Sequence, residues 1–216
     1  MLNKLLKEKI KKFLFKYTKI GAPNYAYNLD PLQLAEIINS LEKVKNLNGV
    51  ICEIGVARGM TTRFICEYFK NFDNKPNFYC IDTYESFAKE DIQYEIDKRA
   101  KNKSELIGFS YNNFDSWKKN FQQFDFVKPI QQDVKNFNFE KIGPIKFVLL
   151  DVDLYLPTMT ALNNLKDNMT EGGVLMVDDV SEGNSWDGAN QAFHEFVKKH
   201  SLKFKLIGKK CGVIEF

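Results

Sequence analysis

The sequence predicts an α/β protein in which one mostly parallel sheet is covered by helices on both faces. From residue 49 onward, five short apolar segments alternate with segments of helical periodicity, which is the pattern of repeated strand–helix units. Two more apolar segments, separated by Gly208-Lys209-Lys210, predict a closing antiparallel hairpin. Together these segments predict a sheet of seven strands.

The predicted strands are short apolar runs, as expected for strands that are buried on both faces of a sheet. Val50, Ile51, Cys52 and Ile54 make up the first of them. The third contains Pro129, which an edge strand tolerates. We place the strands near residues 50–54, 77–82, 127–133, 145–151, 174–179, 204–207 and 211–216.

The predicted helices repeat apolar residues at intervals of three and four positions. Asp30 followed by Pro31 is a typical helix start, because Asp caps free backbone N–H groups and Pro fits the first turn. We expect Gly172 and Gly173 to close the unit that precedes the fifth strand. We place the helices near residues 2–17, 31–41, 59–70, 157–165 and 186–199.

The length and composition predict one domain with additions. A chain of 216 residues with 44 % hydrophobic residues can bury one sizeable core. We expect N-terminal helices in residues 1–48 and the α/β domain in residues 49–216. Residues 84–125 interrupt the strand–helix alternation and are rich in charged and aromatic side chains. We therefore expect them to form an inserted helical cap beside the site.

Residues 2–17 predict a basic amphipathic helix. Its apolar residues share one face, and the first 20 residues hold seven lysines against one acid, Glu8. Such a helix packs on its own domain or on a partner copy, or binds an anionic membrane surface. The sequence leaves these alternatives open. The whole chain has a net charge of +3, which is too small to indicate nucleic acid as a partner.

The sequence favours a cytoplasmic protein, which is membrane-peripheral if the N-terminal helix binds lipid. No apolar run reaches the roughly 18 residues of a membrane-spanning helix. Lysines interrupt the N-terminal apolar residues, so we expect no signal peptide. The four cysteines lack C-x-x-C spacing and are expected to be buried free thiols, as in a reducing compartment.

The first predicted strand leads into a glycine turn that reads Glu53-x-Gly55-x-x-x-Gly59 and opens a helix. The spacing differs from the G-x-G-x-x-G of dinucleotide sites, and an acid at the start suits an amine-bearing ligand. The turn resembles the first motif of class I S-adenosylmethionine (SAM) methyltransferases. That resemblance implies contact with the methionine part of SAM, with Glu53 beside its amino group. Thr61 and Thr62 belong to the same expected site; the alternative is an ordinary turn.

Two further acids follow predicted strands, at the carboxyl edge where α/β sheets bind ligands. Asp82 ends the second strand and is expected to accept hydrogen bonds from the cofactor ribose, with Ser86 in the segment that follows. Asp133 comes just past the third strand and is expected to bind the adenine amino group. The alternative role for each acid is to cap a helix or a turn.

Three carboxylates, Asp151, Asp178 and Asp179, end the fourth and fifth predicted strands. Because these strands are neighbours in the predicted topology, the three side chains converge beside the glycine turn. Carboxylates this close repel one another unless a cation compensates, and oxygen ligands suit Mg²⁺. A bound metal also lowers the pKa of an alcohol from about 15, so that its oxygen can attack a methyl group. The alternative is that Asp178 and Asp179 cap a helix and bind no metal. For the nearby Asp153, the alternative is that it caps the start of a helix.

The segments around these acids narrow the resemblance. Residues 149–158 read Leu-Leu-Asp-Val-Asp-Leu-Tyr-x-x-Thr, and Asp178-Asp179 follows. They resemble the macrocin O-methyltransferase (TylF/MycF-like) family of Rossmann-like class I methyltransferases. The resemblance implies dependence on SAM and Mg²⁺ and methylation of sugar hydroxyls on glycosylated natural products. By position, it implies Asp151, Asp178 and Asp179 as metal ligands and Asp151 or Asp153 as the acceptor of the hydroxyl proton.

The predicted function is O-methylation of a sugar or glycoside, either a surface-polysaccharide precursor or a glycosylated natural product. A second hypothesis is an NAD-dependent oxidoreductase, because Asp82 also suits an NAD ribose. The glycine spacing and the closing hairpin argue against it. A third hypothesis is a methyltransferase-like protein that binds a partner without catalysis, and the retained acids argue against that. A homo-oligomer is compatible with all three.

Overall fold

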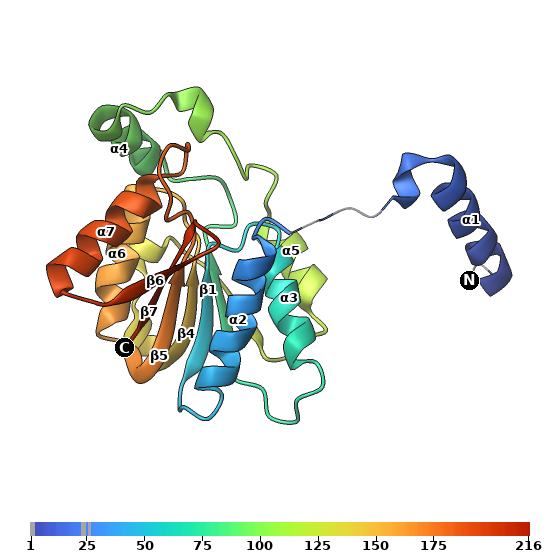
Figure 1. Ribbon diagram of the computed structural model, residues 1–216, viewed down its shortest axis with the longest axis horizontal. Helices are drawn as coiled ribbons and strands as arrows, with labels where there is room; N and C mark the ends of the chain where they lie inside the picture. The colour runs from blue at the N-terminus through green and yellow to red at the C-terminus, as the bar shows by residue number, and fades with distance from the viewer. Residues whose placement is uncertain (1–2, 23–24, 26) are drawn as a thin grey trace.

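The structure, a computed structural model, describes residues 3–22, 25 and 27–216. One seven-stranded sheet has the strand order β3-β2-β1-β4-β5-β7-β6 (Figure 1). The pairs among β1 to β5 are parallel, whereas β7 is antiparallel to both β5 and β6. The predicted Rossmann-like sheet with a closing hairpin is therefore confirmed. The strands are β1 (Val50–Ile54), β2 (Phe78–Asp82), β3 (Val127–Gln131), β4 (Ile145–Leu150), β5 (Met169–Val177), β6 (Phe204–Ile207) and β7 (Cys211–Glu215).

Helices cover both faces of the sheet (Figure 1). The α-helices are α1 (Lys4–Tyr17), α2 (Pro31–Val44), α3 (Met60–Phe69), α4 (Lys89–Arg99), α5 (Phe114–Phe121), α6 (Tyr155–Lys166) and α7 (Gly188–His200). Short 3₁₀ helices are η1 (Lys19–Gly21), η2 (Lys103–Leu106), η3 (Val134–Asn136) and η4 (Phe139–Ile142). Asp30 caps α2 as predicted, since its carboxylate accepts a hydrogen bond from Gln33 N at 2.9 Å.

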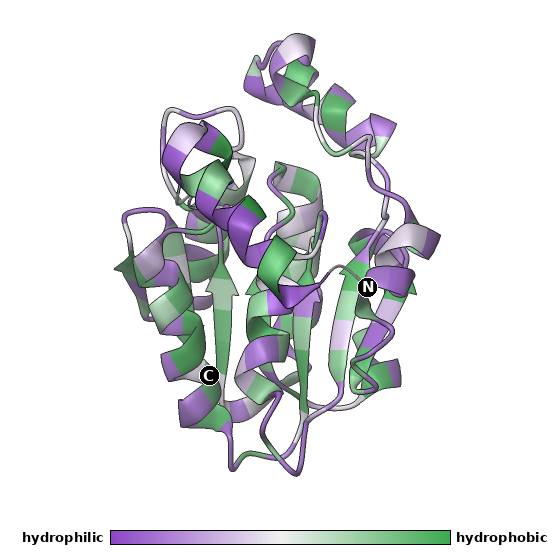
Figure 2. Cartoon of the chain, turned by 90° about the vertical axis from the view of Figure 1, so that its right-hand side faces the viewer, coloured by the Kyte–Doolittle hydropathy of each residue, from purple (hydrophilic) through white to green (hydrophobic). Residues whose placement is uncertain are grey.

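Two hydrophobic cores flank the sheet because alternate strand residues face opposite sides. Ile51 packs with α2, α3 and α5 on one face, whereas Cys52 and Ile54 pack with α6 and α7 on the other. In Figure 2 the strands are largely hydrophobic, and the helices carry both kinds of residue. All four cysteines are buried free thiols, as predicted.

Two element starts differ from the predictions for reasons that the structure shows. Strand β5 begins at Met169, so Gly172 and Gly173 lie inside it and do not close the preceding unit. These glycines are held by hydrogen bonds with the backbone of Phe216, a pairing that no local pattern shows. Helix α6 begins at Tyr155, whose N–H donates to the carboxylate of Glu95 at 2.7 Å. The helix thus begins earlier than predicted, because an acid that is distant in the sequence accepts a hydrogen bond from its first N–H.

Residues 84–125 contain α4, η2 and α5. Helix α5 joins the core beneath the glycine turn through Trp117 and Phe121, which are stacked with ring centroids 4.1 Å apart. Helix α4 instead faces the opposite side of the pocket and packs on α6, with Tyr94 stacked on Tyr155 at 5.3 Å. This segment therefore borders the carboxyl edge of the sheet on two sides.

Helix α1 stands away from the α/β domain (Figure 1), and none of its residues is buried. Its exposed apolar side chains include Leu6, Ile10 and Phe13. Leu2, which the predicted apolar face includes, lies outside the described residues. A search of the described helices finds none with the length and apolar character that a membrane crossing requires.

Candidate active site

A pocket of about 330 Å³ lies at the carboxyl edge of the sheet, where the strand order reverses between β1 and β4. Most of the predicted site residues line it, and Gly59 and Thr62 do not. The predicted residues in the lining are Glu53, Gly55, Thr61, Asp82, Ser86, Asp133, Asp151, Asp153, Asp178 and Asp179.

Gly55 joins the ends of three strands. Its N–H donates to the Ile81 carbonyl at 2.9 Å, and Asp151 N–H donates to the Ile54 carbonyl at 2.8 Å. Its φ is +81°, and a Cβ at this position would lie 1.8 Å from the Asp151 carbonyl oxygen. Only glycine fits this close approach, which brings the glycine turn and the end of β4 together.

Glu53 is the next-to-last residue of β1, beside its final residue Ile54, and is only 2 % exposed. Its carboxylate accepts a hydrogen bond from the hydroxyl of the buried Thr62 at 2.6 Å, which ties Thr62 to the site although it does not line the pocket. Burial raises the pKa of Glu53 to about 8. A protonated carboxyl group with this pKa loses its proton readily when a cationic group comes beside it.

Asp82 organises the glycine turn. One carboxylate oxygen accepts hydrogen bonds from Val56 N (2.7 Å) and Ala57 N (3.2 Å), and the other accepts from Tyr84 N (2.6 Å). Burial raises the pKa of this acid in spite of those bonds. The turn-capping alternative is thus present in the structure. A ribose hydroxyl at Asp82 would share oxygens that already accept backbone bonds.

Asp133 also combines capping with a place in the pocket wall. It caps η3 by accepting from Lys135 N at 2.9 Å, and it lies 3.3 Å from the Lys135 ammonium. Lys135 also pairs with the buried Asp91 of α4 at 2.5 Å. The loop after β3 is thereby fastened to the cap.

The remaining residues of the predicted cofactor site hold the turn and the cap in place. Gly59, at φ +86°, precedes α3, and a Cβ there would lie 2.5 Å from the Phe121 ring. Ser86 donates its hydroxyl hydrogen to the Gly108 carbonyl at 2.7 Å, which closes the loop after β2 on the cap. Thr61 lies in the first turn of α3.

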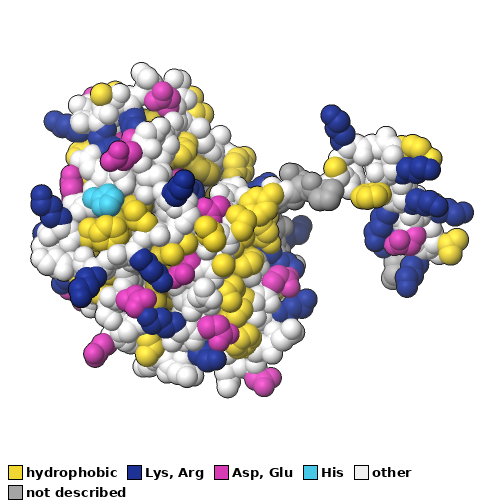
Figure 3. All heavy atoms as spheres, in the orientation of Figure 1, with side chains coloured by type: hydrophobic (Ala, Val, Ile, Leu, Met, Phe, Trp, Pro, Cys, Tyr) yellow, Lys and Arg dark blue, Asp and Glu magenta, His cyan; other side chains and the backbone are white. Residues whose placement is uncertain are grey.

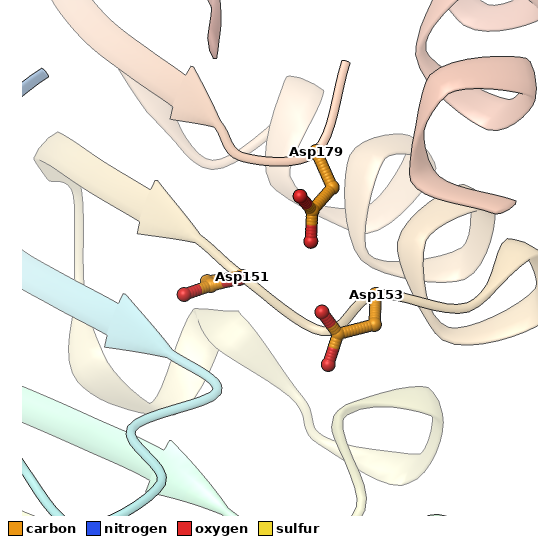
Figure 4. A group of neighbouring side chains, drawn as sticks. All are labelled: Asp151, Asp153 and Asp179. Carbon is orange, nitrogen blue, oxygen red and sulfur yellow. The ribbon is translucent and has the colours of Figure 1, made fainter. Parts of the chain in front are cut away.

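A carboxylate group lies on the other side of the pocket (Figure 4). Asp151, Asp153 and Asp179 each place an oxygen within 4.8 Å of the others. In Figure 4 the carboxylates of Asp153 and Asp179 point toward one another. The backbone of both residues is in the left-handed region, with φ +62° and +56°, a conformation that is uncommon for residues other than glycine and that aspartate adopts more readily than most.

Asp178, the third predicted metal ligand, lines the same pocket but has other partners. One of its oxygens accepts a hydrogen bond from Gln33 Nε2 at 2.6 Å. The other accepts from the Lys210 ammonium at 3.1 Å, and the same ammonium donates to Asp179 at 3.2 Å. The close group thus contains Asp153 in place of Asp178, and Asp178 adjoins it through Lys210.

The negative charges of this carboxylate group repel one another. Burial, and then the neighbouring carboxylates, raise the pKa values of Asp151 and Asp153 well above the usual range of aspartate. The same two causes raise the pKa of Asp178. Clustered acidic oxygens that are short of positive charge are the donor set that a hard divalent ion prefers, so these residues fit Mg²⁺.

Sequence reasoning missed several residues of the pocket. Phe87 and Phe109 of the cap segment and Trp186 after β5 form an aromatic group, with Phe87 5.3 Å from Trp186 between ring centroids. Arg99 and Lys101 fasten the Trp186 loop to the cap by pairing with Asp187 at 2.5 and 2.8 Å. These contacts join segments far apart in the chain, and no local pattern could reveal them.

Gln33 and Lys210 were missed for a related reason. Lys210 follows Gly208 in the hairpin turn, and only the pairing of β7 with β5 brings it beside Asp178. Gln33 appears in the sequence as a helix-capping residue, and its side chain does accept from Asp30 N at 3.0 Å.

The chain is similar to known methyltransferases in sequence and in structure. The family model described as macrocin O-methyltransferase (TylF) matches residues 16–210. Among curated proteins, no sequence matches the chain.

Solved structures share the fold. Apo CalS11, described as a TDP-rhamnose 3'-O-methyltransferase, has a TM-score of 0.63 at 16 % identity, covering 100 % of this chain and 96 % of its own. The O-methyltransferase NovP has a TM-score of 0.64 at 20 % identity, covering 85 % and 78 %. A putative methyltransferase from Streptococcus mutans in complex with S-adenosylhomocysteine (SAH) has a TM-score of 0.50 at 16 % identity, covering 83 % and 96 %.

The family match spans most of the chain, and it agrees with the sheet order and with a pocket at the reversal point. It also decides against the dinucleotide hypothesis. The chain therefore belongs to the macrocin O-methyltransferase (TylF) family and is a SAM-dependent O-methyltransferase.

Proposed function

We propose that this enzyme methylates a hydroxyl group of a sugar or glycoside and uses Mg²⁺ to do so. The observation that carries the proposal is the carboxylate group at the ends of β4 and β5, which opens into the same pocket as Glu53 and the glycine turn. The description of CalS11 as a TDP-rhamnose 3'-O-methyltransferase supports a sugar acceptor. A surface-polysaccharide precursor and a glycosylated natural product both fit this class.

The donor side of the pocket is formed by β1, β2 and the segments that follow them. Glu53 is the proposed partner of the SAM amino group, and the turn from Gly55 to Gly59 is the proposed cradle of the methionine part. Thr61 lines the pocket and is a proposed cofactor contact, and Thr62 contributes to the cofactor site through its hydrogen bond to Glu53. The proposed ribose contacts are Asp82 and Ser86, and the proposed adenine contact is Asp133.

The metal proposal retains Asp151, Asp178 and Asp179 as ligands. Asp151 and Asp179 belong to the close group of oxygens, and Asp178 is the next carboxylate, joined to Asp179 by Lys210. A divalent ion there supplies positive charge that lowers the pKa of an acceptor hydroxyl and keeps the clustered carboxylates ionised.

We assign Asp153 as the residue that takes the hydroxyl proton, with Asp151 as its neighbour. Asp153 has no cationic partner among the described residues, and the backbone of the α7 start holds it, because Ala189 N donates to its carbonyl at 2.9 Å. The acceptor oxygen bonds to the methyl carbon as the carbon–sulfur bond breaks, and SAH leaves. Alignment of the two reactants is the main remaining task of the pocket.

The test is a turnover assay with methyl-labelled SAM and a panel of nucleotide sugars that includes TDP-rhamnose. We expect a labelled, methylated sugar whose formation stops when a chelator removes divalent ions and resumes with Mg²⁺. Methylation that continues in chelator would contradict the metal proposal. SAM binding without turnover on any hydroxyl acceptor would favour the non-catalytic hypothesis.

We also propose that α1 makes a contact beyond its own domain. The lysines of α1 gather around its apolar side chains (Figure 3), and no residue of the helix is buried. Two occupants suit such a helix: an anionic membrane surface, and a second copy of the chain. Binding to a membrane surface would make the enzyme membrane-peripheral, and binding to a second copy would make it a homo-oligomer.

A further inference from the structure

Lys210 reaches into the carboxylate group from the rim of the pocket. It lies in the turn between β6 and β7, and its ammonium donates to Asp178 Oδ2 at 3.1 Å and to Asp179 Oδ1 at 3.2 Å. The side chain of Lys210 is 31 % exposed, whereas those of Asp178 and Asp179 are 4 % and 12 % exposed. A partly exposed cation thus pairs with two enclosed anions.

Lys210 is the single cation within ion-pair distance of the four carboxylates in the part of the chain that the structure describes. Asp151 and Asp153 have no ion pair there. Gln33 occupies the other oxygen of Asp178, so both oxygens of that carboxylate already accept hydrogen bonds. One lysine therefore balances part of the charge of the whole group.

Backbone hydrogen bonds fix the position of the Lys210 main chain. Val180 N donates to the Lys210 carbonyl at 2.7 Å, directly after Asp178 and Asp179. Two residues later, Gly212 pairs with Val177 of β5. The four-carbon stem of a lysine is flexible, however, and its exposed end has room to turn toward solvent.

We propose that Lys210 is an exchangeable counter-ion for the metal site. Its ammonium offsets part of the charge of Asp178 and Asp179 in the metal-free enzyme, and it turns out to solvent when a divalent ion takes the same oxygens. This inference rests on the proposed Mg²⁺ site. The reason for the exchange is that a lysine ammonium and a divalent ion repel each other and compete for the same two carboxylates.

The exchange has two consequences. In the metal-free enzyme, the ion pairs of Lys210 keep the pocket assembled, because they reduce the repulsion between the two carboxylates. The exchange also weakens metal binding, because the ion must displace an ammonium that is already paired. Lys210 is thus a positioning residue that sets the affinity of the site for its metal.

The first test is calorimetric titration of Mg²⁺ and Mn²⁺ into the wild-type chain, Lys210→Met and Lys209→Met. Lys209 is the matched control, since it lies in the same turn and has no ion pair among the described residues. We expect Lys210→Met to bind metal at least about tenfold more tightly, and Lys209→Met to match the wild type. We also expect the metal-free Lys210→Met chain to unfold at a lower temperature, and saturating Mg²⁺ to remove the difference.

Equal or weaker metal binding by a folded Lys210→Met chain would overturn the exchange. A second measurement uses only the wild-type chain, in case that variant does not fold. Lysines are acetylated briefly with and without saturating Mg²⁺, and the modified peptides are quantified by mass spectrometry. We expect Mg²⁺ to increase the labelling of Lys210 severalfold relative to Lys209. Labelling that stays the same or falls would overturn the proposal.

The two levels of failure are distinguishable. If neither ion binds the wild-type chain, the proposed metal site and the exchange both fail. If the ions bind but affinity and labelling do not respond at Lys210, the metal site stands and the exchange alone fails.

Discussion

At the scale of single residues, Glu53 offers a direct test of the donor side. Its pKa is raised to about 8 by burial, so the side chain is mostly protonated at pH 7. An ammonium beside it favours the carboxylate and lowers that pKa. We therefore expect SAM binding at pH 7 to release up to about one proton, and SAM affinity to rise between about pH 6 and pH 8. Calorimetry in buffers of different ionisation enthalpy measures the released protons.

The control is Glu53→Gln, which keeps the hydrogen bond with Thr62 but cannot ionise. We expect this variant to release no proton and to bind SAM about 10 to 100 times more weakly. Proton uptake by the wild-type chain, or the same release by the variant, would contradict a cationic partner at Glu53.

Asp153 and Asp178 have different proposed roles, and asparagine variants separate them. Asparagine tolerates the left-handed conformation of Asp153, so the substitution removes charge without adding backbone strain. We expect Asp153→Asn to lower kcat at least about 100-fold while changing Mg²⁺ affinity little. We expect Asp178→Asn to weaken Mg²⁺ binding about tenfold or more. Turnover assays and metal titration give the two readouts, and the reverse result would make Asp153 the third ligand.

At the scale of elements, the cap depends on Arg99. Its guanidinium pairs with Glu95 at 2.6 Å and with Asp187 at 2.5 Å, and the Glu95 side chain is almost fully buried. Removing this cation leaves a buried acid unpaired, so we expect Arg99→Met to lower the free energy of unfolding by about 3 to 5 kcal/mol. Urea denaturation measures the loss. Lys98→Met, at an exposed position of the same helix, serves as the control and should change stability by less than about 0.5 kcal/mol.

Helix α1 offers a matched pair of phenylalanines. Phe13 lies on the apolar face of the helix with Leu6 and Ile10, whereas Phe15 lies on a different face, and both rings are exposed. We expect Phe13→Ser to weaken the contact that α1 makes, and Phe15→Ser to weaken it much less.

Two assays identify that contact. Co-flotation with vesicles that contain anionic lipid detects membrane binding, and sedimentation velocity detects self-association. If the wild-type chain neither floats nor associates, or if the two variants behave alike, the apolar face of α1 is not a docking surface.

The elements differ in how far the sequence predicted them. Strand β1 (Val50–Ile54) coincides with its predicted range, because a short apolar run between polar residues is a local signal. The predicted start of β5 was wrong, because Gly172 and Gly173 are paired with Phe216, which follows β7 and is distant in the sequence. Predictions thus succeeded where the cause is local and failed where the partner is distant.

At the scale of the whole molecule, the same distinction applies to the site. The sequence predicted that Asp151 and Asp179 converge, because parallel strands end at one edge of a sheet. It could not predict that Asp178 contacts Gln33 and Lys210, since these partners are 145 and 32 residues away. It also could not show that backbone N–H groups of the glycine turn already occupy Asp82.

The adjacency of β1 and β4 has a consequence for how the enzyme acquires its activity. Val50–Ile54 pairs with Ile145–Leu150, so a long stretch of chain must be looped out before the middle of the sheet can close. Helices form early in refolding, yet the wall shared by Gly55 and Asp151 exists only after that late closure. We therefore expect refolding chains to recover SAM affinity with the slowest phase, well after their helical signal, as stopped-flow circular dichroism and ligand capture can show. No half-folded intermediate would hold the methyl donor.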